Sequence, residues 1–333
     1  MKIVFDAFGG DNSPVEAIKG AVLALQARQD FDIILVGKEE IIYQELHKYS
    51  YEKDRTTVVD APEIISNEDS PAIAVRKKKN SSIVVGLKLL NDTPDCDVFV
   101  SAGSTGAVLT ASTLLLKRLP GVFRPALAPV LPAIGNKQVI LVDCGANVEV
   151  KPEMLVQFAL IGTAYARTLS GNQNITVGLL NNGREVGKGT NVIQEAYELI
   201  SQNKKINFIG NIEARDILSG EVDVVVADGF SGNIALKASE GTALMILKLI
   251  KESILKNGLR AKIGYLLLKP AFKDMKRTLD YNDNGGAVLL GLDKLVIKTH
   301  GSSMAKSFCA AILQAVNIAE KGVITQVSNI LSE

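Results

Sequence analysis

Short apolar runs rich in Val and Ile alternate along the chain with longer stretches in which apolar residues recur every three or four positions. The short runs predict strands at 3–5, 32–36, 57–59, 98–100, 139–142, 176–179, 207–209 and 222–226. The longer stretches predict helices at 14–29, 39–48, 71–78, 83–90, 107–116, 152–169, 191–202 and 233–256. Strands that are apolar on both faces and alternate with helices indicate a mostly parallel sheet covered on both sides. We therefore expect an α/β fold with three α/β/α layers.

The pattern shows no internal repeat and no low-complexity linker, so we expect residues 1–333 to form a single α/β domain. One segment departs from the alternation. Residues 251–281 predict two helices joined by a hinge near Asn257 and Gly258, which together form a protruding hairpin. The last stretch, 303–331, predicts one closing helix.

Six glycine-containing turns follow predicted strands or precede predicted helices, at 6–11, 101–107, 143–147, 183–189, 228–233 and 300–303. Glycine lets the backbone approach a ligand, and the free N–H groups of a helix start favour an anion such as phosphate. One such turn is usually only a helix cap. Several at the same edge of a parallel sheet, where ligands bind, indicate a phosphate site.

Composition and motifs exclude several classes. Of the 333 residues 47% are hydrophobic, and 37 Lys and Arg nearly balance 36 Asp and Glu, so no global charge draws the chain to nucleic acid. The chain has no GxxxxGK[ST], GxGxxG or GxSxG motif and only two histidines, His47 and His300. The three cysteines are widely spaced, which is typical of free thiols in a reducing cytosol. Neither a secretion signal nor an apolar run long enough to cross a bilayer is seen in the sequence.

Cationic residues stand near several of these turns. The basic run 76–82, with Lys78 and Ser81, ends in a good helix start, and it fits a phosphate site and a solvated surface equally well. Arg124 precedes an apolar segment, Lys188 lies in the turn 183–189, and Lys237 follows Asn233 by one helical turn.

The motifs in this order resemble the phosphate acyltransferase family PlsX (phosphate:acyl-acyl carrier protein acyltransferases). The resemblance runs from the first strand to the last glycine turn. It rests on DAFGGD, RKKKNSS, SAGSTGA, RPALAPVLP, DCGAN followed by KPE, NFIGNIEARD, DGFSGNIALK, and NDNGGA followed by HGSS. The family more often has Met at Phe8, Asn at Ser104 and an aliphatic residue at Asn182, which leaves the pocket lining open.

The resemblance implies a fold like that of isocitrate dehydrogenase and phosphotransacetylase. It implies an enzyme that makes acyl phosphate and free carrier protein from long-chain acyl-acyl carrier protein and inorganic phosphate. The product would feed phospholipid synthesis through a membrane-embedded glycerol-phosphate acyltransferase. The resemblance further implies a cytoplasmic homodimer at the inner face of the cell membrane, with no cofactor, no metal and no nucleic acid partner.

We expect phosphate to attack the thioester directly, because phosphate near neutral pH is already a nucleophile and a thiolate leaves readily. The expected catalytic residues are Lys188, Asn233 and His300, with His300 as a proton donor or a structural residue. The expected binding residues are Asp6, Gly9, Gly10, Lys78, Ser81, Gly103, Ser104, Thr105, Gly106, Arg124, Asp143, Asn147, Asp228, Gly229, Ser231 and Gly232. A covalent intermediate on Cys144 is the rival mechanism.

The predicted hairpin is strongly basic, with eight Lys and Arg against two acidic residues over 251–277. Its apolar residues recur at helical spacing. We expect its membrane or carrier-protein contacts at Leu259, Arg260, Ile263, Leu266, Leu267 and Lys273. Packing of this face on a dimer partner is an equal alternative.

Three other functions stay open at this point. A phosphate acetyl- or butyryltransferase would use the same nucleophile with coenzyme A thioesters. A metal-dependent decarboxylating dehydrogenase would need clustered carboxylates that the sequence does not show. A non-catalytic phosphate sensor or membrane scaffold would bind lipid without turnover.

Overall fold

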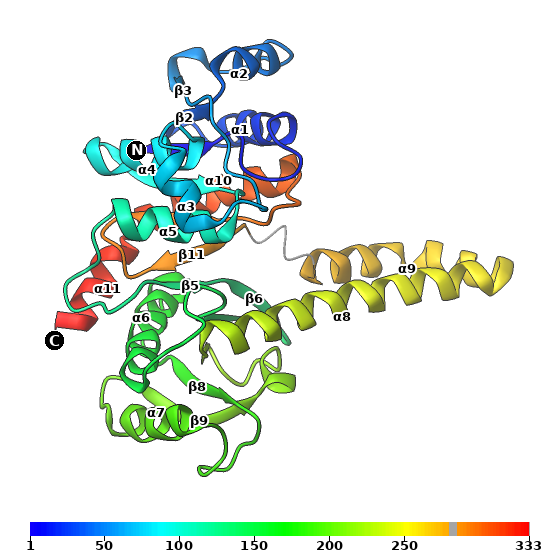
Figure 1. Ribbon diagram of the computed structural model, residues 1–333. Helices are drawn as coiled ribbons and strands as arrows, with labels where there is room; N and C mark the ends of the chain where they lie inside the picture. The colour runs from blue at the N-terminus through cyan, green and yellow to red at the C-terminus, as the bar shows by residue number, and fades with distance from the viewer. Residues whose placement is uncertain (280–284, 333) are drawn as a thin grey trace.

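The computed structural model describes residues 1–279 and 285–332. The predicted strands are all present, and together with four shorter ones they form two sheets. The α/β class is therefore confirmed, with the strands divided between two sheets where the sequence predicted one. Figure 1 shows these two α/β layers stacked one above the other, with a long helical hairpin projecting to the side.

The first sheet has the order β3-β2-β1-β4-β12-β11-β5. Its strands are β1 (Lys2–Asp6), β2 (Asp32–Gly37), β3 (Thr56–Asp60), β4 (Cys96–Ser101), β5 (Ala126–Ala128), β11 (Ala287–Leu290) and β12 (Leu295–Lys298). All its pairs are parallel except those that β11 makes with β12 and β5.

The second sheet has the order β6-β7-β10-β8-β9. Its strands are β6 (Val130–Ala133), β7 (Lys137–Val142), β8 (Thr176–Asn181), β9 (Asn207–Glu213) and β10 (Val224–Val226). Only the pair of β6 with β7 is antiparallel. The sequence pattern missed β5, β6, β11 and β12, which have only three or four residues each.

Helices cover both sheets. They are α1 (Val15–Ala27), α2 (Glu39–Leu46), α3 (Pro71–Lys77), α4 (Ser82–Asp92), α5 (Thr105–Leu115), α6 (Pro152–Ser170), α7 (Asn191–Gln202), α8 (Gly229–Lys256), α9 (Gly258–Leu279), α10 (Ala305–Glu320) and α11 (Val323–Ser332), with short 3-10 turns at Lys53–Arg55 and Ala214–Asp216. Because strand side chains alternate between faces, Ile3 and Phe5 pack in the cluster that holds α1 and α10. Val4 packs on the opposite side, with α4 and α5.

The predicted closing helix over 303–331 was wrong, because the chain bends there. The axes of α10 and α11 meet at 49° across Lys321 and Gly322. Gly322 has a φ of +65°, a left-handed conformation that suits glycine and ends α10. Both helices pack on the core, α10 against α1 and α11 against α6.

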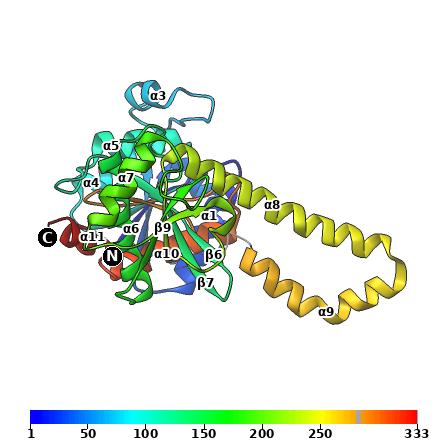
Figure 2. The same ribbon diagram turned by 90° about the horizontal axis from the view of Figure 1, so that it is seen from below.

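The structure contains a helical hairpin with its turn at the predicted place, near Asn257 and Gly258, but its first arm is the C-terminal part of α8, which begins well before residue 251, and residues 280–281 lie outside the described part of the chain. Helix α8 runs to Lys256, and α9 begins at Gly258, whose φ of +71° reverses the chain. The two helices pack on each other and project from the body, as Figure 2 also shows from below. No single helix in 1–279 or 285–332 is long and apolar enough to cross a bilayer.

Candidate active site

A cavity of about 560 Å³ lies between the two sheets. Five of the six predicted glycine turns contribute to its wall, through Asp11, Gly103, Thr105, Gly106, Cys144, Gly145, Asn233, His300, Gly301 and Ser302. Helix α8 adds Lys237 and Glu240, and β12 adds Lys298. The sixth turn, 183–189, is not among the described residues of this wall. The expectation that the turns meet at one place therefore holds for five of them.

The end of β1 is tied to the end of β4 through a buried carboxyl group. Asp6 Oδ2 accepts a hydrogen bond of 2.6 Å from Ser101 Oγ, which itself accepts one of 3.0 Å from Gly103 N. Burial raises the pKa of the Asp6 carboxyl group, although the hydrogen bond from Ser101 opposes the rise. A Cβ on Gly9 would lie 2.6 Å from Asp6 Oδ2, so this close approach requires glycine. Asp6 and Gly9 thus hold the turn 101–107 in place.

The turn 101–107 opens helix α5 onto the cavity. Ser104 is the N-cap, its side chain makes no capping bond, and Thr105 and Gly106 line the cavity wall. The first N–H groups of a helix have no partner within the helix, and the helix dipole favours an anion there. Gly10, with a φ of +99°, packs this turn against the last one, because a Cβ there would lie 2.9 Å from Gly301 O.

Lys298 is a charged cavity residue that the sequence analysis missed. It ends β12, directly beside Ser101 of β4, and its Nζ donates to Ala102 O at 3.4 Å and to Thr299 O. Its burial lowers the pKa of the ammonium group to about 8. The signal in the sequence was a lysine that closes an apolar strand two residues before the turn 300–303.

His300 and Lys237 are in contact on the wall of the cavity. Lys237 Nζ lies 3.4 Å from His300 Nε2 and donates to Glu240 Oε2 at 2.6 Å, while His300 Nδ1 lies 2.7 Å from Ser302 Oγ. Burial, and then the charge of Lys237, lower the pKa of His300. His300 is therefore a neutral imidazole at neutral pH, which weakens its expected role as a proton donor.

The turn 143–147 is stabilised by hydrogen bonds to the carboxylate of its own first residue, Asp143. Asp143 is fully buried, and its two carboxylate oxygens accept four hydrogen bonds, from Leu127 N, Ala146 N, Asn147 N and Asn147 Nδ2, at 2.6 to 3.2 Å. Burial raises the pKa of Asp143, while these donors lower it. Asn147 Nδ2 also donates to Pro125 O at 2.9 Å. Asp143 and Asn147 therefore shape the turn and do not line the cavity.

Helix α8 begins against the same turn. Asp228 Oδ1 accepts from Phe230 N and Ser231 N, so Asp228 is a helix cap. A Cβ on Gly232 would lie 2.0 Å from Asp143 O, and one on Gly229 2.7 Å from Asn147 O. These glycines allow close packing, which brings Asn233 to the cavity wall beside Gly145.

The predicted residues Lys78, Ser81 and Lys188 also lie away from the cavity. Lys78 Nζ donates to Asp69 Oδ2 at 2.6 Å and to Ile64 O at 2.9 Å, and Lys78 is the first cause of the lowered pKa of Asp69. Ser81 is the buried N-cap of α4. Lys188 lies on an exposed loop, where its carbonyl accepts from Asn181 Nδ2 at 3.1 Å.

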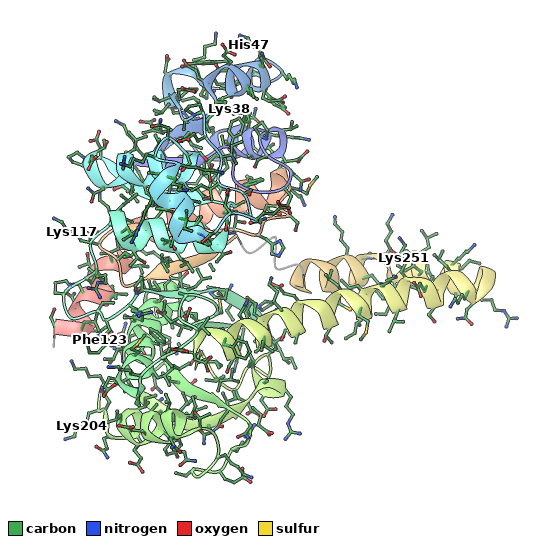
Figure 3. The ribbon with its side chains drawn as sticks, viewed as in Figure 1. Lys38, His47, Lys117, Phe123, Lys204 and Lys251 are labelled. Carbon is green, nitrogen blue, oxygen red and sulfur yellow. The ribbon has the colours of Figure 1, made fainter. Side chains whose placement is uncertain are left out.

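Arg124 lines a second hollow, of about 520 Å³, together with Arg76 and Arg118. Leu114 and Phe123 add apolar surface, and the described lining contains no carboxylate. Ala146 and Asn147 belong to this lining, while the preceding Cys144 and Gly145 line the main cavity. Figure 3 labels Phe123 on the side of the body opposite to Lys251 of the hairpin.

Cys144 lines the main cavity but is buried, and burial raises the pKa of its thiol well above the usual value. The thiolate is the nucleophilic form, so this environment disfavours a covalent intermediate on Cys144. Among the described residues, no three His, Cys, Asp or Glu side chains are grouped to hold a metal ion.

Known structures resemble this fold at low sequence identity. They include the EutD phosphotransacetylase from Staphylococcus aureus, with a TM-score of 0.58 and 17% identity over 96% of this chain and 94% of that one. A branched-chain phosphotransacylase from Enterococcus faecalis has a TM-score of 0.59 and 14% identity over 96% and 99% of the two chains. At these identities the likeness shows the fold alone.

Sequence relatives are closer. Residues 1–326 match a family model described as a fatty acid synthesis protein. The phosphate acyltransferase of Clostridium novyi is 46% identical over 329 residues, which cover 99% of this chain and 98% of the relative. That of Alkaliphilus oremlandii is 46% identical over 328 residues, or 98% and 96% of the two chains. On this full-length match the chain belongs to the phosphate acyltransferase (PlsX) family, enzymes of fatty acid and phospholipid synthesis.

Proposed function

We propose that this enzyme transfers a long-chain acyl group from acyl carrier protein to inorganic phosphate, in the cavity between the two sheets. The observation that carries the proposal is the convergence in one cavity of the start of helix α5, at Thr105, with the side chain of Asn233 and the cations Lys237 and Lys298. Such a site suits a phosphate dianion and the oxyanion that forms next to it.

The reaction needs no cofactor and no covalent enzyme intermediate. A phosphate oxygen forms a bond to the thioester carbonyl carbon, and the resulting tetrahedral oxyanion collapses as the carbon–sulfur bond breaks. The carrier protein leaves as a thiolate, whose pKa in an ordinary cysteine is about 8.5. The enzyme's main task is then to orient two anionic partners and to stabilise negative charge.

Within this proposal, backbone N–H groups at Thr105 and Gly106 and the side chain of Asn233 contact phosphate or the oxyanion. His300 orients groups at the cavity wall. Lys188 contacts the substrate from its exposed loop, outside the described wall of the cavity.

The arginine-lined hollow gives the donor a route to the cavity. Arg76, Arg118 and Arg124 complement an acidic carrier protein and the phosphodiester that links its thiol arm. The turn 143–147 separates this hollow from the main cavity, so an arm bound there would deliver its thioester across Gly145.

The hairpin places the enzyme at a membrane in this proposal, as a peripheral homodimer that passes acyl phosphate to a glycerol-phosphate acyltransferase in the membrane. Its apolar side chains are widely exposed, with Ile263, Leu266 and Leu267 at 52, 67 and 76%. Arg260 and Lys273 stand among them. An exposed apolar face with basic flanks fits an anionic lipid surface. The side chain of Leu259 lies outside the described residues.

Turnover of long-chain acyl-acyl carrier protein in phosphate buffer, with hydroxylamine to trap the product, tests the reaction. Acyl-coenzyme A runs in parallel, because the structural likeness to phosphotransacetylases makes a coenzyme A donor the second candidate. Phosphate-dependent hydroxamate from the carrier-protein thioester supports the proposal. Hydroxamate from acyl-coenzyme A alone would show that the enzyme uses coenzyme A thioesters, the second candidate.

Sedimentation with anionic vesicles tests the hairpin. We expect the double variant Leu266→Asp, Leu267→Asp to stay in the supernatant while the wild type pellets. The double variant Tyr43→Asp, Ile64→Asp makes the same charge change at exposed positions on the body and should pellet normally. Equal pelleting of all three proteins would refute lipid contact by the hairpin.

A further inference from the structure

We propose that the Lys298 ammonium group is the principal binding contact for the phosphate substrate, and that it holds the nucleophile beside the start of α5. This inference rests on the proposed function in taking phosphate as the substrate. It adds a residue that the family motifs did not indicate.

The position of Lys298 is fixed by the sheet. Residues of β12 pair in parallel with β4, so Lys298 lies beside Ser101, where β4 ends and the turn into α5 begins. The side chain is buried, with 9% of the residue exposed, and yet it lines the cavity. Its Nζ, within 3.4 Å of Ala102 O, therefore sits close to the free N–H groups of α5.

The Lys298 ammonium group has one N–H donor that no acceptor in the described residues fills. An ammonium group has three N–H donors. Two are taken by Ala102 O and Thr299 O, and in 1–279 and 285–332 no acceptor is found for the third. A buried cation with an unused donor is costly unless a ligand supplies the missing acceptor and charge.

The other charged groups of the cavity support this assignment. Lys237 already has Glu240 at 2.6 Å, and that pair leaves little net charge for a ligand. Asp6 lies behind the wall and is bound to Ser101, and Asp11 lines the wall next to Gly301. Within the described chain Lys298 has no carboxylate within ion-pair distance, although Asp6 and Asp11 act on its charge from farther away, so its charge is less neutralised than that of Lys237.

Phosphate held at Lys298 would have one oxygen on the ammonium group and others at the N–H groups of Thr105 and Gly106. Its remaining oxygen would face the cavity, where the thioester enters. As the bond to the carbonyl carbon forms, the same cation stays close to the phosphate charge. Lys298 is thus a catalytic residue that acts by binding and orientation and takes part in no proton transfer.

Steady-state kinetics of Lys298→Met and Lys298→Arg test the assignment. We expect Lys298→Met to lose about 10- to 100-fold in kcat/KM for phosphate, the loss expected of a hydrogen bond to a charged group, with little change in KM for the acyl donor. Lys298→Arg keeps the charge and should recover part of that loss. Unchanged KM for phosphate in Lys298→Met would overturn the proposal.

Lys294→Met is the matched control. Lys294 immediately precedes β12 and donates to a backbone carbonyl, Cys96 O at 2.8 Å, but at the opposite end of the strand from the cavity. Its kinetics should match the wild type. An equal loss of phosphate affinity in both variants would mean that the effect is structural, which would also refute the proposal.

Chemical labelling of lysines in the wild-type enzyme tests phosphate binding at Lys298 without measuring turnover and without a variant that must fold. Cyanate is small enough to enter the cavity, and it carbamylates uncharged lysine amines. Inorganic phosphate should slow carbamylation of Lys298, followed by mass spectrometry, and leave Lys294 unchanged. Protection without phosphate-dependent turnover would keep the binding site and refute the reaction, whereas equal rates with and without phosphate would refute the binding site.

Discussion

Asp143 and Lys298 are both buried charged residues at the ends of central strands, one in each sheet, and they differ in how their hydrogen bonds are filled. The carboxylate of Asp143 accepts four N–H donors from its own turn and from β5. The ammonium group of Lys298 has two carbonyl acceptors for three donors. Asp143 stabilises a turn in the wall of the cavity, whereas Lys298 is left with a donor for a ligand inside the cavity.

The difference teaches how to separate scaffold from site among polar residues that look alike in the sequence. A buried charge whose hydrogen bonds are all made inside the protein stabilises the fold. A buried charge that lacks a partner is costly to the fold, and function is the usual reason for that cost. Four changes test this contrast.

Asp143→Ala should have the largest effect on stability. It leaves four buried or half-buried donors without an acceptor, so we expect a loss of at least about 4 kcal/mol in the free energy of unfolding. Urea denaturation measures it. Asp143→Asn keeps one oxygen acceptor and should lose about half as much. A loss below about 1 kcal/mol in Asp143→Ala would contradict the scaffold role.

Lys298→Met should change the pH dependence of stability in phosphate-free buffer. Because the folded pKa of Lys298 is about 8 and the ordinary value is 10.5, the folded state binds the proton more weakly. The wild type therefore bears the full cost of the buried charge below pH 8 and gains up to about 3 kcal/mol as pH rises to 10.5.

The variant lacks this gain, so the stability of the wild type relative to Lys298→Met should increase between pH 8 and 10. Thermal unfolding of both proteins across that range measures the difference. Parallel curves would show that Lys298 carries no buried charge. Asp6, Asp11 and Lys237, which also face this site, are common to both proteins and largely cancel.

Gly232→Ala tests the contact of α8 with the scaffold turn. The new Cβ would lie 2.0 Å from Asp143 O, and we expect a loss of about 2 kcal/mol. Gly241→Ala is the control in the same helix, where a Cβ meets nothing within 4 Å. It should stabilise the protein by about 0.5–1 kcal/mol, because alanine is the better helix former. Similar effects of the two variants would contradict the packing argument.

Cys144→Ala should have the smallest effect. Since burial keeps the thiol protonated and direct attack by phosphate needs no enzyme nucleophile, kcat should stay within about twofold of the wild type. Hydroxamate formation by the two proteins is the comparison. Complete loss of turnover in a folded Cys144→Ala protein would restore the covalent mechanism.

The sequence predicted the α/β alternation because strands buried on both faces, such as β1 and β4, leave an unmistakable apolar run. It could not predict the division into two sheets, since strand pairing depends on contacts far apart in the chain. Strands β5, β6, β11 and β12 are too short for a period of two to appear. The bend at Gly322 was hidden because the residues on both sides keep helical spacing.

The sequence also located most turns of the cavity, because glycine with Ser, Thr or Asn marks a strand end whatever the tertiary structure. It could not tell which polar side chains face inward. Asp143, Asn147 and Asp228 carry the right chemistry but use it on backbone N–H groups. Lys298 carries no motif of its own, and only the register of β12 against β4 shows its place.

Helix α8 is one uninterrupted rod that starts at the cavity and ends at the tip of the hairpin. From Asn233 to Lys256 it rises about 35 Å at 1.5 Å per residue, and only its first three turns touch the cavity. The length of the hairpin can therefore change without any change in the residues that line the cavity near the start of α8. Seven residues inserted into α8 after Glu240, with seven more inserted into α9, would move the tip of the hairpin about 10 Å outward. The side chains that line the cavity would keep their positions. The same enzyme could in this way be fitted to surfaces at different heights.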